Sequence, residues 1–201
     1  MSTYSAGMMS VPFLFIETQN TARLLAEGLS VAEVKEQVLR NNVYQMQSVY
    51  RAERYFNAIL RRLTVLPDSL FSALAEGDLA QAKLLLVIAI ARTDLLFFEF
   101  MHQVYRLALN VGRKTLESRD INIFFNQMAR QSDVVASWAE STVRHLKSSF
   151  IKVLAEAGLL DSTREPRAII QGHLPEAIVK ELKNAGLTTY LACVLGDAYV
   201  S

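Results

Sequence analysis

Apolar residues recur at intervals of three and four positions along almost the whole chain, a spacing that is typical of amphipathic helices. We therefore predict an all-α fold, a compact multi-helix globular domain with helix-turn-helix-like joints and no substantial sheet. The only candidate for β-structure is a short hairpin around residues 160–172, and the mixed pattern of residues 188–200 leaves their state open. Helices are expected at residues 18–27, 31–40, 43–66, 69–75, 79–91, 93–111, 120–130, 134–157 and 175–186.

Residues that begin and end helices stand at the boundaries of these segments. Ser30 is a good N-cap, and Glu33 three residues later completes a capping box. Asp78 is placed to cap the apolar helix that follows it, and Gly158 is placed to end the long helix before it. The Asn41-Asn42 pair suits a turn, so a tight joint is predicted between the second and third helices.

Two apolar stretches raise the question of a membrane segment, because the mean hydropathy of +0.19 is high for a water-soluble protein. Residues 84–91 are uniformly apolar, but Lys83 and Arg92 bound a stretch far shorter than the roughly 20 residues that a spanning helix needs. Residues 11–16 are also apolar, but no Lys or Arg precedes Arg23, so no secretory signal is predicted. We expect a buried core helix and no association with a membrane.

Composition narrows the class of protein. The 201 residues carry 21 Lys and Arg against 20 Asp and Glu, a net charge of +1. A polybasic tail or a histone-like protein is thereby excluded, and any charged site depends on how the charges are arranged. The single cysteine, Cys193, excludes an internal disulfide framework and fits a reducing cytoplasm. We predict one domain, 1–201, with a division into 1–112 and 113–201 as the alternative, and a monomer, since no heptad repeat is sustained.

The sequence contains little that indicates catalysis or metal binding. His102, His145 and His173 have no metal-binding partner at helical spacing, and Gly-rich phosphate loops and the Gly-x-Ser-x-Gly motif are absent. Cys193 lies between apolar neighbours, which favours a buried thiol over a nucleophile. We therefore predict no enzymatic activity, no metal and no cofactor.

The most informative pattern is a row of arginines in and just before the predicted helix at 43–66. On a helical wheel these arginines fall within one arc, opposite the apolar residues. Five arginines and one acidic residue, Glu53, lie between residues 40 and 62, which gives a local net charge of +4. Arginine forks suit phosphate oxygens and guanine edges, although a solvated helix face is the alternative interpretation. The candidate nucleic-acid contacts are Arg40, Tyr44, Gln47, Arg51, Arg54, Arg61 and Arg62.

Two joints in basic regions resemble helix-turn-helix joints. The first would place Tyr44 and Gln47 near the start of a recognition helix. The second lies at residues 131–133, before the long helix predicted at 134–157. Around residues 138–152 that helix carries a second basic cluster against a single acid, Glu140, and two basic joints favour nucleic-acid binding more than either alone. The further candidate contacts are Arg144, Lys147 and Lys152.

Three stretches together carry a family resemblance. They are residues 33–42 with the later Arg54 and Arg61-Arg62-Leu63, residues 84–100 with Phe98-Glu99-Phe100, and residues 138–160 with Trp138-x-x-Ser141-Thr142 and Leu154 to Leu160. The chain resembles, over about residues 13–165, the BrxA family of the bacteriophage exclusion (BREX) defence systems. The resemblance implies a small, all-helical, non-enzymatic component of a multi-protein phage-defence system, with double-stranded DNA as its ligand.

We therefore predict a cytoplasmic, all-α, non-enzymatic protein of a BREX-type system that binds double-stranded DNA mainly through its phosphates. Its expected partners are double-stranded DNA and other BREX components. Two alternatives stay open at this point. One is a helical adaptor whose basic faces bind acidic protein surfaces in the same system, and the other is an RNA-binding helical bundle of the antitermination-factor kind.

Overall fold

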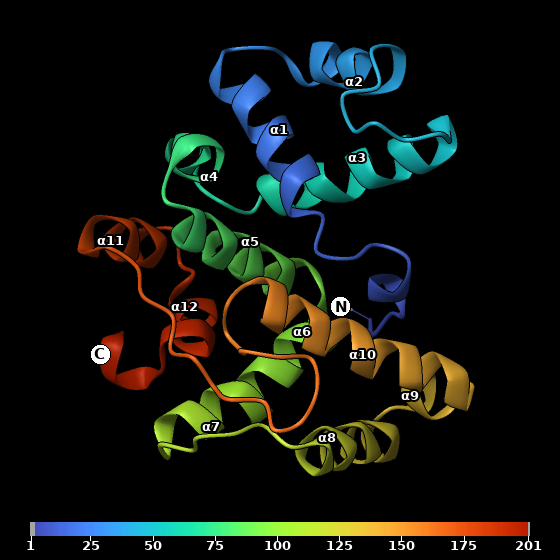
Figure 1. Cartoon of the computed structure of the whole chain (residues 1–201), viewed down its shortest axis with the longest axis vertical. Coiled ribbons are helices and arrows are strands. Elements are labelled where there is room, and N and C mark those ends of the chain that lie inside the picture. The colour runs from blue at the N-terminus through green and yellow to red at the C-terminus, as the bar shows by residue number, and fades with distance from the viewer. Residues whose placement is uncertain (1–2, 201) are drawn as a thin grey trace.

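The chain folds almost entirely into helices, as Figure 1 shows for this computed structural model, which describes residues 3–200. The α-helices are α1 (Phe15–Ala26), α2 (Val31–Arg40), α3 (Val49–Leu63), α4 (Phe71–Glu76), α5 (Leu79–Thr93), α6 (Leu95–Phe100), α7 (Arg106–Asn110), α8 (Ser118–Gln131), α9 (Asp133–Ala136), α10 (Glu140–Glu156), α11 (Glu176–Asn184) and α12 (Thr188–Leu195). The 3-10 helices are η1 (Gly7–Met9), η2 (Asp68–Leu70) and η4 (Asp197–Tyr199), and the π-helix η3 (Met101–Tyr105) joins α6 to α7. Residues 3–200 contain no strand, and the predicted all-α fold is confirmed.

The hairpin expected around residues 160–172 does not form as paired strands. The segment folds back through one isolated antiparallel bridge, between Leu160 and Ile169. A second isolated bridge, between Thr115 and Ala168, ties it to the residues before α8. These two bridges fix the position of the segment beside α8 and α10.

Helix boundaries follow the capping residues where these are strong. Ser30 and Glu33 form the predicted capping box at α2: the Ser30 N–H donates to Glu33 Oε2 at 2.8 Å, and the Glu33 N–H donates to Ser30 Oγ at 3.3 Å. Gly158 follows α10 with a φ of 78°, a left-handed conformation that glycine adopts without strain. Both boundaries confirm the predictions.

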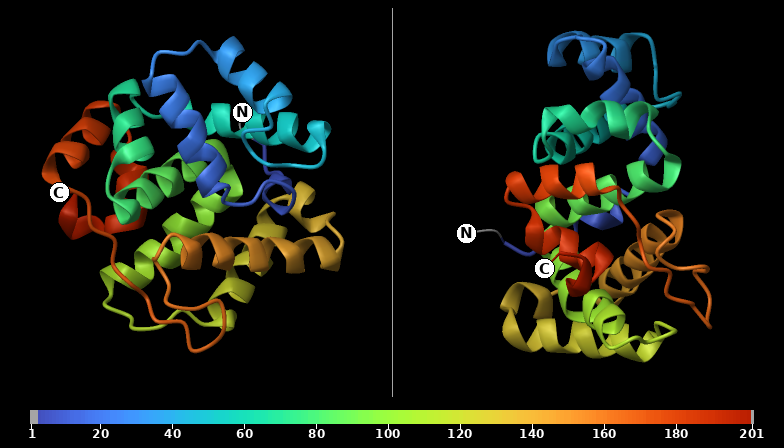
Figure 2. Two further views of the ribbon diagram at one scale, coloured as in Figure 1. Left: turned by 45° about the horizontal axis from the view of Figure 1, so that its top comes forward. Right: turned by 90° about the vertical axis from the view of Figure 1, so that its left-hand side faces the viewer.

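The core is built around α5. Every residue from Leu84 to Ala91 is buried, and α3, α4, α6 and α12 pack against this helix. This all-round burial explains why the stretch is uniformly apolar. Among residues 3–200, no helix combines the length and the apolar composition that a membrane crossing requires. Figure 2 shows α1–α3 stacked at one end of the molecule and α8 at the other, with α5 between them.

The helix predicted at 43–66 begins later than expected. Residues 41–48 form an irregular connection, in which Asn42 and Gln45 have φ values of 51° and 53°. These left-handed residues interrupt helical geometry, and α3 starts only at Val49, where the Ser48 hydroxyl accepts from the Arg51 N–H. The connection is therefore longer than the three or four residues of a helix-turn-helix joint.

Two other long helices are also interrupted. The segment predicted as one helix over 93–111 is α6, the π-helix η3 and α7 in succession. The segment predicted over 134–157 consists of the short α9 and the long α10, separated at residues 137–139. Ala139 is extended, with a ψ of 149°. The second predicted joint, at 131–133, is thus followed by a single helical turn rather than by a long helix.

The N-terminal segment, residues 7–13, lies between α3 and α10 (Figure 1). On one side, η1 packs against α10. On the other side, Arg54 and Arg62 of α3 donate hydrogen bonds to backbone carbonyls of residues 10–13. This segment therefore fixes the position of one basic helix relative to the other.

Candidate nucleic-acid interface

Helix α3 has one buried side and one exposed side, as its pattern predicts. Ala52, Phe56, Ile59 and Leu63 are each at most 2% exposed and face the core. These positions are separated by three or four residues, so they share one face of the helix. Everything that α3 offers to a partner must therefore come from the opposite face.

The opposite face carries a line of polar residues, Tyr50, Arg54, Asn57 and Arg61, all of which are exposed. Their spacing of four, three and four places them in a row of about 16 Å, at 1.5 Å rise per residue. Arg51, which is also exposed, lies beside the start of the row. We call Arg51, Arg54 and Arg61 the arginine stripe.

The arginine stripe is not neutralised by nearby carboxylates. Within residues 3–200, none of its three arginines forms an ion pair, and the acid on the same helix, Glu53, pairs with Lys35 at 2.7 Å. Arg54 makes only a long hydrogen bond, 3.4 Å, to the Ser10 carbonyl, and its guanidinium lies 5.7 Å from the Tyr55 ring centre. Three cationic side chains are therefore available to an anionic partner.

Arg62 does not belong to this surface, and its prediction as a nucleic-acid contact is wrong. Its side chain is 5% exposed, because the N-terminal segment covers it. Nη1 donates to the carbonyls of Pro12 and Phe13 at 3.0 Å each, and Nη2 donates to that of Val11 at 3.2 Å. Burial lowers the pKa of Arg62 to about 10, still well above neutrality, so the buried guanidinium stays charged and satisfies backbone acceptors.

Tyr44 is also a core residue rather than a contact, so this prediction is wrong too. It is 7% exposed, and its hydroxyl is 2.6 Å from the hydroxyl of Thr21 in α1. Gln47 is exposed but lies in the 41–48 connection, outside α3. Arg40 ends α2 and pairs with Glu36 at 2.6 Å. The structure therefore separates these three predicted contacts from the arginine stripe.

The basic residues of α10 are each engaged with a neighbour. Arg144 lies 3.5 Å from Glu140, and Lys152 lies 3.6 Å from Glu156, in exposed pairs one turn apart. Such pairs are weak and exchange readily with solvent. Lys147 is half-buried, donates to Asn122 of α8 at 2.8 Å, and sits 5.5 Å from the Phe125 ring centre. The α10 cluster is less free than the arginine stripe.

Two residues of the α3 face were missed from the sequence. Tyr50 is 76% exposed, and Asn57 is exposed in the same row as Arg54 and Arg61. The polar spacing of four, three and four residues is present in the sequence, but only the arginines of this row are among the predicted contacts. An exposed tyrosine next to arginines adds a flat amphipathic surface to a cationic one.

Fold and surface together define a small all-helical protein with an arginine-bearing helix at its surface. A family model described as BrxA matches residues 2–186. A BREX protein BrxA from Bacillus cereus (strain H3081.97) is 33% identical over 194 residues, 96% of this chain and 97% of the relative. The chain belongs to the BrxA family, which confirms the resemblance found in its sequence.

More distant proteins agree with this assignment. A BREX protein BrxA from Escherichia coli O9:H4 (strain HS) is 27% identical over 186 residues, 92% of this chain and 87% of that protein. The crystal structure of an uncharacterized protein from Magnetospirillum magneticum matches the whole of both chains with a TM-score of 0.81, at 18% sequence identity. This last likeness is one of fold.

Proposed function

We propose that this chain is a non-enzymatic, double-stranded DNA-binding component of a BREX phage-defence system, and that other BREX components are its protein partners. Its place in the BrxA family supports the link to the system, since its relatives are named BREX protein BrxA. One observation carries the DNA-binding part: the arginine stripe is exposed and none of its members is paired with a carboxylate among residues 3–200.

The chemistry of the stripe suits a polyphosphate backbone. Guanidinium groups stay charged at all physiological pH values and donate fork-like hydrogen bonds to phosphate oxygens. The net charge of the whole chain is only +1, so binding depends on this local surface rather than on a general attraction. Contacts to phosphates position a protein on DNA without selecting a sequence, and we propose weak sequence preference.

The experiment is a salt titration of binding to unrelated DNA duplexes. Each phosphate contact that is removed should flatten the slope of log K against log salt by about 0.9. The double variant Arg54→Ala with Arg61→Ala should therefore bind all duplexes more weakly and flatten the slope by about 2. Both side chains are exposed, so stability should change by no more than about 0.5 kcal/mol for each.

A matched control removes the same charge elsewhere. The double variant Lys180→Ala with Lys183→Ala also lowers the net charge by two, but on α11. Its salt slope should equal that of the unchanged protein. An Arg54/Arg61 double variant that folds and keeps both affinity and slope would refute the stripe as the DNA site. Competition by single-stranded RNA stronger than by duplex DNA would favour the RNA-binding alternative.

The second candidate function is a protein adaptor within the same system. Exposed apolar residues favour it: Leu107, Val111 and Ile123 are 51%, 73% and 45% exposed, and they line one groove between α7 and α8. Apolar side chains grouped at a surface are a common mark of protein contact. No duplex binding at low salt, together with copurification of another BREX component, would favour this function over DNA binding.

A further inference from the structure

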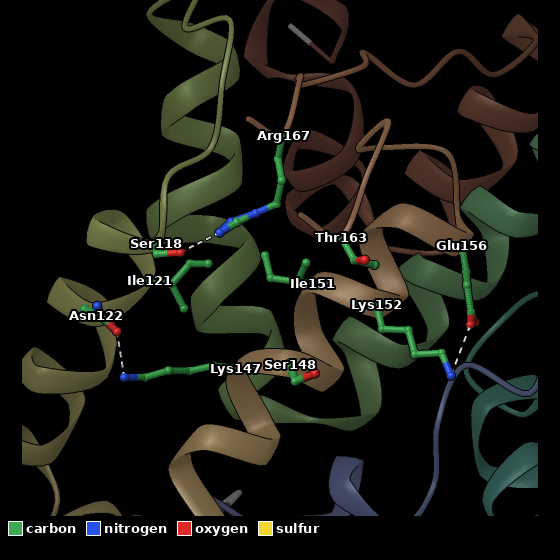
Figure 3. A pocket seen from close by; sticks show the side chains of 10 residues that line it. All are labelled: Ser118, Ile121, Asn122, Lys147, Ser148, Ile151, Lys152, Glu156, Thr163 and Arg167. Atoms are coloured by element: carbon green, nitrogen blue, oxygen red, sulfur yellow. Dashed lines mark hydrogen bonds and ion pairs between the residues drawn. The ribbon is translucent and has the colours of Figure 1, made fainter. Parts of the chain in front are cut away.

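A second surface feature lies away from the arginine stripe, in a cleft between α8, α10 and the segment after α10. The cleft has a volume of about 510 Å³, which is within the range of small-molecule sites. Figure 3 shows Ile121 and Ile151 in its middle, Arg167 and Ser118 at one end, and Lys152 at the other. Its lining thus combines an apolar floor with cationic ends.

Arg167 is the unusual residue of this cleft. Its side chain is 5% exposed, and the Leu116 N–H donates to its carbonyl at 3.0 Å, which holds it beside the start of α8. Nη2 donates to Ser118 Oγ at 2.7 Å and to Glu165 Oε1 at 3.1 Å. Nε and Nη1 are buried and have no acceptor among residues 3–200.

Buried donors without an acceptor are rare in folded proteins, because each loses its hydration without compensation. The deficit is larger for a guanidinium, whose charge is also desolvated. Glu165 balances part of the charge but does not satisfy these donors, because among the guanidinium nitrogens it accepts from Nη2 alone. The Arg167 side chain lines the cleft, so an acceptor that enters the cleft would satisfy these donors once the guanidinium turns toward it.

The remaining groups of the cleft favour a negatively charged acceptor. Lys147, Lys152 and Arg167 contribute three positive charges, and Glu156 and Glu165 contribute two negative charges, which leaves +1. Within residues 3–200 Lys147 forms no ion pair; it donates to an amide oxygen and lies over an aromatic ring. Burial lowers the pKa of this lysine, and the charge of Glu140 offsets part of that effect.

The hydroxyls of the cleft narrow the class of anion. Ser118, Ser148 and Thr163 line it together with the cationic groups. A terminal phosphate has three strong acceptor oxygens and suits several donors arriving from different directions. The isoleucine floor and the volume leave room beside that group for an apolar or planar portion of the ligand.

We propose that this cleft binds a nucleotide, with the phosphate group at Arg167 and Ser118, the sugar or base against Ile121 and Ile151, and Lys152 at the far end as a donor to the base. The site does not rest on DNA binding by the arginine stripe, because it lies on other helices. The phosphate can come from a free mononucleotide or from a nucleotide in the DNA backbone. The two sources share the same recognition chemistry, and the experiment separates them.

The test follows the backbone amide resonances of Ser118, Ser148 and Thr163 by NMR during titration of the full chain. Adenosine monophosphate should shift them in a saturable way, and adenosine, which lacks the phosphate, should not. Arg167→Gln should weaken the binding at least about tenfold, the factor that corresponds to 1.4 kcal/mol. Lys152→Gln should weaken it severalfold.

Controls keep the test decisive. Lys152 is 61% exposed, so Lys152→Gln should fold even if Arg167→Gln does not, and Lys180→Gln on α11 should bind like the unchanged protein. Shifts of the cleft amides with a short duplex but not with the mononucleotide would assign the phosphate to DNA. Absence of shifts with both ligands, or equal shifts with adenosine, would overturn the proposal. Loss of DNA binding in the Arg54/Arg61 double variant with mononucleotide binding intact would separate the two sites.

Discussion

Arg61 and Arg62 are adjacent in sequence, and the structure predicts opposite results when each is changed to alanine. Arg62 holds three backbone carbonyls of the N-terminal segment and is 5% exposed. The Arg61 side chain projects into solvent. Arg62→Ala should therefore destabilise the protein, and Arg61→Ala should weaken DNA binding in a protein of unchanged stability.

The loss of stability expected for Arg62→Ala follows from the three hydrogen bonds that its side chain donates. The Phe13 carbonyl is in a buried bond, so it is left unsatisfied, at a cost of about 1–3 kcal/mol. The bonds to Val11 and Pro12 are partly buried, and water can replace each at a cost of about 0.5–1.5 kcal/mol. Removal of a desolvated charge returns part of this sum. We expect a loss of about 3 kcal/mol for Arg62→Ala and no more than about 0.5 kcal/mol for Arg61→Ala.

Urea denaturation followed by circular dichroism measures this difference. For an m value of about 2–3 kcal/mol/M, the midpoint for Arg62→Ala should fall by about 1–1.5 M, and that for Arg61→Ala should stay in place. Arg62→Lys should lie between them, because an ammonium keeps the charge but cannot match the guanidinium fork. An unchanged midpoint for Arg62→Ala, or an equal fall for both alanine variants, would refute the role of Arg62 in holding the backbone carbonyls of residues 11–13.

Two further predictions concern the core. Leu86→Ala should lower the free energy of unfolding by about 2–5 kcal/mol, since Leu86 is fully buried. Leu79→Ala on the same helix should lower it far less, because Leu79 is 56% exposed. Equal urea midpoints for the two variants would place Leu86 outside the core. Burial raises the pKa of the Cys193 thiol to about 12, so the thiol stays protonated at mildly alkaline pH and iodoacetamide should alkylate it only after unfolding. Mass spectrometry that finds the folded protein alkylated would contradict this burial.

Local rules predicted the parts of the fold that depend on near neighbours. The capping box of Ser30 and Glu33 involves residues three positions apart, and Gly158 ends α10 through its own backbone conformation. The burial of residues 84–91 follows from their apolarity and their charged flanks. These features are fixed by short stretches of sequence, so the sequence alone was sufficient to predict them.

The site was predicted less well, because the residues placed wrongly are positioned by contacts with distant parts of the chain. The wheel places Arg62 beside Arg51, and no local pattern indicates that residues 11–13, about fifty positions earlier, cover it. The break before α3 depends on left-handed Asn42 and Gln45. Tyr44 lies in that irregular connection and is buried, with its hydroxyl hydrogen-bonded to Thr21 of α1. Burial by tertiary contacts, not helix propensity, decided these positions.

The arrangement of the N-terminal segment has a consequence for synthesis of the chain on the ribosome. Residues 7–13 are translated before the two helices that enclose them, which end at residues 63 and 156. At about 5–20 residues per second, roughly 7–30 s pass between the translation of Phe13 and the completion of α10. During this interval Met8 of η1, which is buried in the finished protein, lacks the cover that α10 provides. The nascent chain therefore presents an apolar side chain of η1 to chaperones until α10 has been made.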